Sequence, residues 1–177
     1  EDFPWYLEKA LVAIEDKRFY EHKGVDWYRT SGAFVEMFAT MQNTYGGSTI
    51  TQQLIKNVTN DKDRDAMRKL REIVRATLIT RKLTKKEILE AYLNTISLGN
   101  GICGVQVAAN YYFNKDVSEL NLTECAALAA ITKNPSRFNP VTEKGAVENK
   151  KRRQTVLDKM LELKMISYDE YDKAYNT

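Results

Sequence analysis

Apolar residues recur at helical spacing along most of the chain. Leu7, Leu11 and Ile14 share one helix face and predict a first helix. This helix should start near Pro4 and end at about Asp16. Similar patterns predict further helices at 26–44, from 48 onward, and at 67–78, 84–95, 105–113, 123–132, 142–165 and 167–176. No convincing pair of strands is present, so the sequence predicts an all-α fold, with a small hairpin near Gly46 as the open alternative.

Two of the predicted helix starts carry capping boxes, in which two side chains three residues apart bond to each other's backbone. Thr49 with Gln52 marks the first, and Thr84 with Glu87 marks the second. Free backbone N–H groups at the first start should face a cleft and attract an anion. Lys56 follows one turn later, and it is either part of such a site or an ordinary solvated lysine.

The helix predicted at 26–44 places Phe34, Phe38 and Met41 on one face. Two interpretations stay open for this face. It either packs into the core, or forms an exposed amphipathic surface that dips into a membrane interface.

The helix predicted at 67–78 has two different sides. Arg68, Glu72 and Arg75 line one side at i+4 and i+3 spacing, which is typical of a salt-bridged surface helix. The other side carries an apolar stripe, formed by Met67, Leu70, Val74 and Leu78. The alternative interpretation is a cationic wall of Arg68 and Lys69 beside the carboxylate of Glu72.

Composition limits the functional classes. A chain of 177 residues can form one domain with a proper core, and its net charge of +3 is too small to imply nucleic acid as a partner. Cys103 and Cys125 lack metal-ligand spacing and are either free buried thiols or one disulfide. No apolar run is long enough to span a membrane, and the chain begins at Glu1 without a methionine. We therefore expect a piece of a longer protein, from which an N-terminal signal or anchor has been removed.

Glu15 is the first candidate for chemistry. It falls on or beside the apolar face formed by Leu7 and Leu11, where a carboxylate loses hydration. Such a loss makes an acid a better proton acceptor near neutral pH. The ordinary alternative is that Glu15 lies at the edge of this face and pairs with a nearby cation, namely Lys17, Arg18 or Lys23.

Five ordered motifs resemble those of the peptidoglycan glycosyltransferases, the transglycosylase domains of class A penicillin-binding proteins and related monofunctional enzymes. The motifs are EDKRFYEHKG at 15–24, GGSTITQQLIKN at 46–57, RKLRE at 68–72, KKEILEAYLN at 85–94 and GVQVAANYYFNKD at 104–116. The resemblance implies a lysozyme-like all-α fold with a head lobe, a smaller membrane-contacting jaw lobe at about 25–60, and a cleft between them. It also implies that 1–177 is a single glycosyltransferase domain.

The resemblance implies the chemistry as well. The enzyme would polymerise lipid II into glycan strands by inverting glycosyl transfer, and would release undecaprenyl pyrophosphate. Glu15 matches the family's catalytic base, which takes the proton of the acceptor's 4-hydroxyl. Lys56, Arg68, Lys69 and the helix start at Ser48 and Thr49 would stabilise the charge on the pyrophosphate.

Glu72 matches the family's second glutamate. Its expected role is to position the donor, with two alternatives: holding Arg68 and Lys69, or helping to bind a divalent cation (Mg or Mn) near the pyrophosphate. No cofactor is otherwise expected. Asp16 and His22 should fix the loop that follows Glu15. The remaining substrate-binding candidates are Phe19, Ser48, Thr49, Gln52 and Gln53.

By the same resemblance, the partners are lipid II, the growing glycan strand and the membrane surface, with a moenomycin-type inhibitor expected in the cleft. The location would be the outer face of the bacterial cytoplasmic membrane, with an N-terminal anchor missing from this chain. There is no Ser-x-x-Lys motif for a transpeptidase in these residues.

Two rival functions remain. A glycan hydrolase on the same scaffold also uses two carboxylates, but it has little need for several cations at one spot. A non-enzymatic helical module would bind acidic partners through its basic face, and would tolerate replacement of Glu15.

Overall fold

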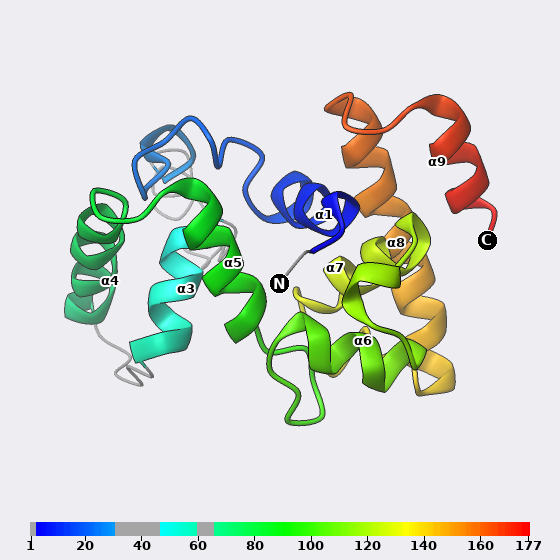
Figure 1. Cartoon of the computed structure of the whole chain (residues 1–177). Coiled ribbons are helices and arrows are strands. Elements are labelled where there is room, and N and C mark those ends of the chain that lie inside the picture. The colour runs from blue at the N-terminus through cyan, green and yellow to red at the C-terminus, as the bar shows by residue number, and fades with distance from the viewer. Residues whose placement is uncertain (1–2, 31–46, 60–65) are drawn as a thin grey trace, which may run out of the picture. The chain divides into compact units, whose positions relative to one another are not determined.

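The computed structural model describes residues 3–30, 47–59 and 66–177 (Figure 1). Within these ranges the regular elements are helical, and one isolated antiparallel bridge joins Ser97 to Cys103. The prediction of an all-α fold is therefore confirmed for the described residues. The helices are α1 (Trp5–Glu15), α3 (Ile50–Thr59), α4 (Ala66–Ile79), α5 (Lys85–Thr95), α6 (Val105–Phe113), the short 3-10 helix η1 (Val117–Glu119), α7 (Leu122–Ile131), α8 (Glu143–Glu162) and α9 (Tyr168–Tyr175). Residues 27–30 are helical as well.

The chain divides into two compact units. Unit 1 consists of Glu1–Glu15 with Ile96–Thr177, and unit 2 consists of Asp16–Thr95. The boundary falls inside the first motif, so Glu15 belongs to unit 1 and the rest of that motif to unit 2. The expected jaw lobe at 25–60 stays a prediction.

In unit 1, α7 forms the centre because it is apolar on every side. It is buried along nearly its whole length, and α1 and α8 pack against it (Figure 1). Leu7 and Leu11 of α1 are buried, as the periodicity predicts. Asn149 of α8 is also buried, and its Nδ2 donates to the Ala127 carbonyl of α7 at 3.2 Å. Because a buried amide needs partners, this bond fixes the position of α8 along α7.

Several helix ends in unit 1 differ from prediction by one to three residues. α7 starts at Leu122, just before the predicted Thr123, because Asn121 caps it and accepts the Glu124 N–H at 3.0 Å. α8 ends at Glu162, before the predicted Met165. Lys164 takes a left-handed conformation with φ of 54°, which stops the helix.

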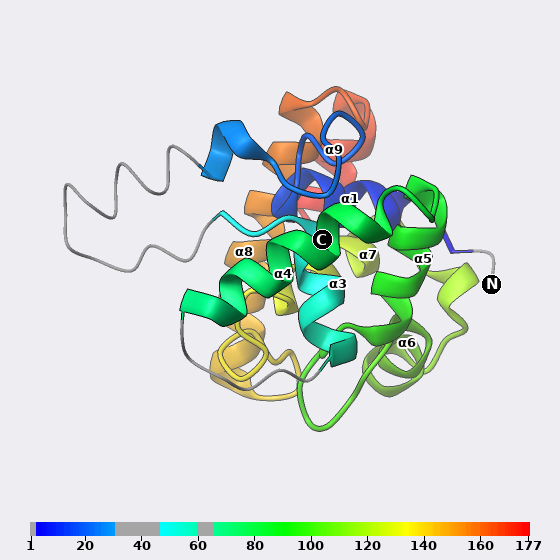
Figure 2. The same ribbon diagram turned by 90° about the vertical axis from the view of Figure 1, so that its left-hand side faces the viewer.

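In unit 2, α3 packs against both α4 and α5 (Figure 2). A small apolar core joins α3 and α4, with Ile55 and Ala76 buried in it beside Val25. Both predicted capping boxes are confirmed. Thr49 N–H donates to Gln52 Oε1 at 3.0 Å and Gln52 N–H to Thr49 Oγ1 at 3.1 Å. The Thr84 and Glu87 box closes in the same way.

α4 has apolar residues on two opposite faces. Its inner face packs on the small core through Ile73, Ala76 and Ile79. The stripe seen in the sequence points the other way, with Met67, Leu70, Val74 and Leu78 each about half exposed, at 56%, 52%, 49% and 50%. The stripe is therefore an exposed apolar surface rather than the packed face of the helix.

Some expectations fall outside the described residues. These are the face formed by Phe34, Phe38 and Met41, and the hairpin near Gly46. Among the helices that are described, none is both long and apolar enough to cross a bilayer.

The two cysteines are free, so the disulfide alternative is wrong. Cys103 is exposed, whereas Cys125 is buried in α7. Burial, with a smaller contribution from the charge of Glu124, raises the pKa of the Cys125 thiol to about 12. The thiolate is the reactive form, so Cys125 is an inert core residue.

Candidate active site

Glu15 is the last residue of α1 and lies in unit 1, where it is half-buried. The hydroxyl of Thr132, at the C-terminal end of α7, contacts Glu15 Oε1 at 2.7 Å. Both residues stand at helix ends that meet because α1 packs on α7. The Thr132 hydroxyl thus holds the Glu15 carboxylate, which lies at the end of the apolar face of α1.

Arg152 of α8 brings a positive charge to the same carboxylate. Burial lowers the pKa of this guanidinium, and the nearby charge of Glu15 acts against that shift. Its buried Nε has no hydrogen-bond partner within the described residues. Arg152 was missed in the sequence because no local spacing links it to Glu15.

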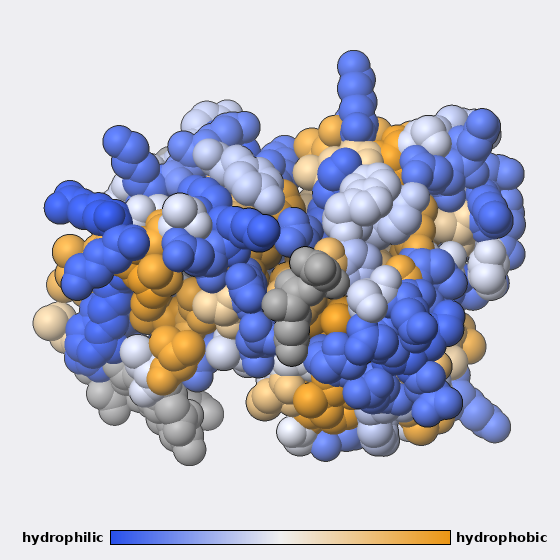
Figure 3. Space-filling view, in the orientation of Figure 1, coloured by the Kyte–Doolittle hydropathy of each residue, from blue (hydrophilic) through white to orange (hydrophobic). Residues whose placement is uncertain are grey.

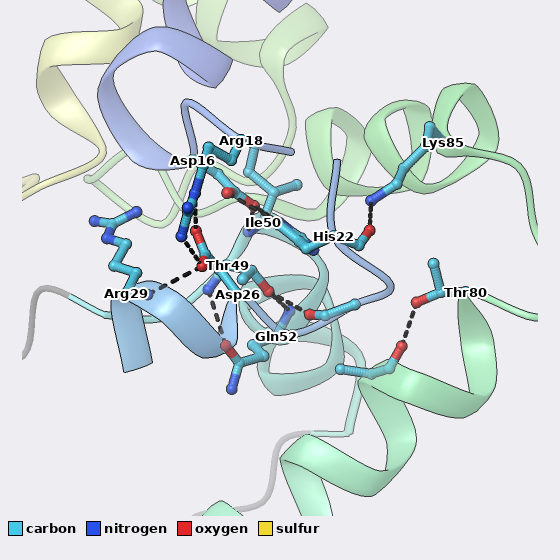
Figure 4. A network of polar contacts seen from close by, with 12 residues as sticks. Asp16, Arg18, His22, Asp26, Arg29, Thr49, Ile50, Gln52, Thr80 and Lys85 are labelled. Atoms are coloured by element: carbon cyan, nitrogen blue, oxygen red, sulfur yellow. Dashed lines mark hydrogen bonds and ion pairs between the residues drawn. The ribbon is translucent and has the colours of Figure 1, made fainter. Parts of the chain in front are cut away.

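In unit 2, Asp16 anchors the loop that follows Glu15. Asp16 is only 1% exposed, and its carboxylate oxygens lie 2.9 and 3.0 Å from His22 Nε2 (Figure 4). It also accepts the backbone N–H of Ile50, the first residue of α3, at 3.0 Å. Asp16 and His22 therefore belong to the framework that ties this loop to α3.

The same loop is closed by a second buried carboxylate, that of Asp26. Arg18 donates through Nε at 2.9 Å and through Nη2, and the Arg29 N–H donates at 3.0 Å (Figure 4). Burial raises the pKa of Asp26, but the Arg18 and Arg29 hydrogen bonds outweigh it and leave this pKa below its ordinary value. Arg18 is thereby committed to Asp26. Sequence reasoning considered Arg18 only as a partner of Glu15.

Side chains of unit 2 accept hydrogen bonds from backbone N–H groups at the start of α3. The Ile50 N–H donates to Asp16 and the Gln52 N–H to Thr49, so the prediction that this end offers free N–H groups is wrong for these two amides. Thr49 Oγ1 in turn donates to the Gly24 carbonyl at 2.7 Å. Thr49 and Gln52 are 0% and 1% exposed. Their contacts are those of a structural cap.

Gly24 is required where the loop crosses α4. Its φ is 92°, in the left-handed region that glycine tolerates best. A Cβ here would lie 2.3 Å from the Ala76 carbonyl oxygen, which is far too close. The glycine that ends the first motif therefore permits the contact between loop and helix.

Phe19 and Lys85 fill the interior side of the loop. Phe19 is fully buried, and the Lys85 ammonium lies 4.4 Å from its ring centre. Lys85 also donates to the His22 carbonyl at 2.7 Å. Burial lowers the pKa of Lys85, against the opposing charge of Asp16. Phe19 is thus a core residue of unit 2.

A cationic cluster forms around Glu72 on α4. The Glu72 side chain is 7% exposed, pairs with Lys69, and accepts from Arg68 Nη1 at 3.3 Å. Lys69 Nζ also donates to Ser48 Oγ at 3.1 Å, which links α4 to the segment before α3. The structure brings these four predicted residues together. We call them the Glu72 cluster.

Lys56 lies beside this cluster on the surface of unit 2. It is exposed, and it shares a small hollow with two members of the cluster. The hollow is lined by Ile55, Lys56, Thr59, Arg68, Glu72 and Arg75. Gln53, by contrast, turns toward α5, where its Oε1 accepts the Tyr92 hydroxyl at 3.1 Å.

The described residues do not fit a divalent cation held by Glu72. Its carboxylate already pairs with two cations. Across 3–30, 47–59 and 66–177, no three His, Cys, Asp or Glu side chains come together as metal ligands do. No step below is routed through a metal ion.

Residues 1–161 match the family model described as Transglycosylase. The chain belongs to the transglycosylase family. All the predicted site residues lie within the matched range, and the family resemblance of the five motifs is confirmed.

Curated relatives of this transglycosylase are penicillin-binding proteins. Penicillin-binding protein 1F of Bacillus subtilis is 41% identical over 96% of the chain, and penicillin-binding protein 1A of Clostridium perfringens is 42% identical over 99%. These alignments cover 23% and 27% of the relatives. The chain thus spans about a quarter of the length of these relatives.

A solved structure shares the fold of this transglycosylase. It is the crystal structure of penicillin-binding protein 1A from Haemophilus influenzae, with a TM-score of 0.56 and 27% sequence identity. The match covers 98% of this chain and 16% of that one. Fold and sequence therefore point to the same family.

Proposed function

We propose that this transglycosylase is a peptidoglycan glycosyltransferase that polymerises lipid II into glycan strands and releases undecaprenyl pyrophosphate. The observation that carries the proposal is the family match over residues 1–161. Two sites supply the groups that the reaction needs, namely a held carboxylate at Glu15 and the cations around Glu72.

Glu15 acts as the general base. It takes the proton from the acceptor's 4-hydroxyl while that oxygen forms a bond to the anomeric carbon of the donor. The bond from this carbon to the pyrophosphate oxygen breaks, and its electron pair leaves with the pyrophosphate. The donor sugar is α-linked and the polymer is β-linked, so direct displacement inverts the anomeric centre.

The Glu72 cluster serves the leaving group. Negative charge grows on the pyrophosphate as the bond breaks, and cations placed beforehand stabilise it. Glu72 holds Arg68 and Lys69 in place before the reaction, so these side chains do not have to reorganise as the charge develops. Lys56 adds a third, exposed cation at the hollow that it shares with Arg68. Of the roles considered for Glu72, holding this pair has the support of its contacts.

We place the enzyme at the outer face of the bacterial cytoplasmic membrane, where lipid-linked substrate would reach it. The exposed apolar stripe of α4 supports this placement (Figure 3, left). Basic residues lie next to the stripe in the sequence, as in helices that lie on anionic lipid. They are Arg71 within α4, and Arg81 and Lys82 just after its end. A moenomycin-type inhibitor, which resembles the lipid-linked strand, should compete at the same groups.

The deciding experiment incubates the purified chain with lipid II in detergent and follows glycan polymer on a gel. We expect polymer from the wild type and none from Glu15→Gln. Glu143→Gln is the matched control, because it removes an exposed carboxylate at the start of α8. Equal turnover in Glu15→Gln would refute the assigned base. Cleavage of preformed strands, without polymer from lipid II, would show the hydrolase instead.

A further inference from the structure

The hydroxyl of Thr132 has two acceptors within reach. Its Oγ1 lies 2.7 Å from Glu15 Oε1 and 2.8 Å from the Ala129 carbonyl oxygen. A threonine hydroxyl carries a single proton, so it can donate to only one of them at a time. The Glu15 carboxylate oxygen and the Ala129 carbonyl oxygen therefore compete for the single hydroxyl proton of Thr132.

The charge on Glu15 decides which acceptor receives this proton. Hydrogen bonds to a charged acceptor are about twice as strong as those to a neutral one. When Glu15 is a carboxylate, the Thr132 hydroxyl should donate to it. Once Glu15 has taken a proton it is a weaker acceptor, and the hydroxyl can turn to the Ala129 carbonyl without leaving a donor unpaired.

We propose that Thr132 is a positioning residue for Glu15, whose hydroxyl holds the carboxylate before proton transfer and turns to Ala129 afterwards. The inference rests on the proposed function of Glu15 as the base. Thr132 carries no proton away in this scheme. The acceptor's proton goes to Glu15 and later to water, and the Thr132 proton only rotates between two acceptors.

The charged groups around Glu15 are compatible with this role. α7 and α8 make the main helix contacts to α1 in unit 1, and Glu170 of α9 accepts the Tyr6 hydroxyl near the other end of α1. On α7, the only carboxylate is that of Glu124, which lies at the opposite end of the helix from Thr132 and pairs with Lys115 at 2.7 Å. On α8, the Arg152 guanidinium places its positive charge near Glu15 and stays charged at neutral pH. Arg152 therefore keeps its charge while Glu15 gains and loses a proton.

The test compares Thr132→Val, which keeps the shape but removes the hydroxyl, with Thr132→Ser, which keeps the hydroxyl. Thr95→Val is the matched control. Thr95 also ends a helix, and it donates to the Ala91 carbonyl of α5 at 2.8 Å. Lipid II polymerisation is measured for each variant across pH, together with the melting temperature.

We expect Thr132→Val to lower kcat roughly tenfold to a hundredfold, as the loss of a hydrogen bond to a charged group would, with KM nearly unchanged. The acid limb of its rate profile should move to higher pH, because a bond that favours the charged form is gone. Thr132→Ser should restore both. A Thr132→Val profile equal to that of Thr95→Val, or a serine variant as slow as valine, would overturn the proposal. If Thr132→Val does not fold, Thr132→Ala replaces it.

Failure of the proposed function can be distinguished from failure of the inference about Thr132. In that case the wild type itself makes no polymer, and carbon-detected NMR of the Glu15 carboxyl decides the inference. Its titration should move to higher pH in Thr132→Val, and an unchanged titration would refute the contact. Glu15→Gln assigns the signal.

Discussion

The buried carboxylate of Asp16 accepts the backbone N–H of Ile50, which lies 34 positions later in the sequence, at 3.0 Å. This bond joins the first motif to the start of α3 in unit 2. The carboxylate also contacts His22 Nε2 at 2.9 Å. One buried group therefore positions both the loop and the start of α3. A negative charge at a helix N-terminus is stabilised by the helix dipole as well.

Asp16→Ala should destabilise unit 2. It leaves the Ile50 N–H and the His22 ring nitrogen without their buried partner, which costs about 2–4 kcal/mol in the free energy of unfolding. Urea denaturation followed by circular dichroism measures this loss. Asp169→Ala, at an exposed position, is the control and should change stability by less than about 0.5 kcal/mol. Equal stability of the two variants would contradict the assigned role.

Asp26 should make the stability of unit 2 depend on pH. Its pKa in the folded protein lies below the ordinary value of 3.8, through the Arg18 and Arg29 bonds that outweigh burial. The stabilisation is therefore present above about pH 4 and is lost as pH falls through the lowered folded pKa. Denaturant midpoints between pH 7 and pH 2 should fall less steeply for Asp26→Asn than for the wild type. Parallel curves would exclude Asp26 from this dependence.

Local features of the fold could be read from the sequence. Both capping boxes, Thr49 with Gln52 and Thr84 with Glu87, are confirmed because each depends on side chains three residues apart. Periodicity likewise predicts the buried face of α1. It could not choose between the two apolar faces of α4, because the choice depends on what packs against the helix.

The contacts of the candidate site depend on long sequence separations. Thr132 and Glu15 are 117 positions apart, and no local spacing connects them. The helix start at Thr49 looked open in the sequence for the same reason, since the carboxylate that closes it comes from Asp16. The motifs thus predicted contacts between residues that are close in sequence, such as Lys69 and Glu72. They did not predict the partners that other segments supply.

Lys69→Ala should impair catalysis more than stability. Lys69 bridges Glu72 and Ser48, and it is one of the cations assigned to the pyrophosphate. Loss of such a group should lower kcat on the order of a hundredfold to a thousandfold. Initial rates with lipid II measure this, and Lys86→Ala removes an exposed lysine of α5 as the control. A rate within twofold of the control would remove Lys69 from the reaction.

The outward stripe of α4 should bind lipid. Leu70→Ser with Val74→Ser removes apolar surface that is half exposed, so it should weaken binding to membranes while leaving the melting temperature nearly unchanged. Sedimentation with vesicles of mixed neutral and anionic phospholipid measures the bound fraction at low and high salt. Val147→Ser, which is 56% exposed on α8, is the control for loss of an apolar side chain elsewhere. Salt should weaken the binding of the wild type, because Arg71 is next to Leu70 in the sequence and its attraction to anionic lipid is screened. A fall in melting temperature without any change in vesicle binding would instead mean that the stripe supports the fold of unit 2.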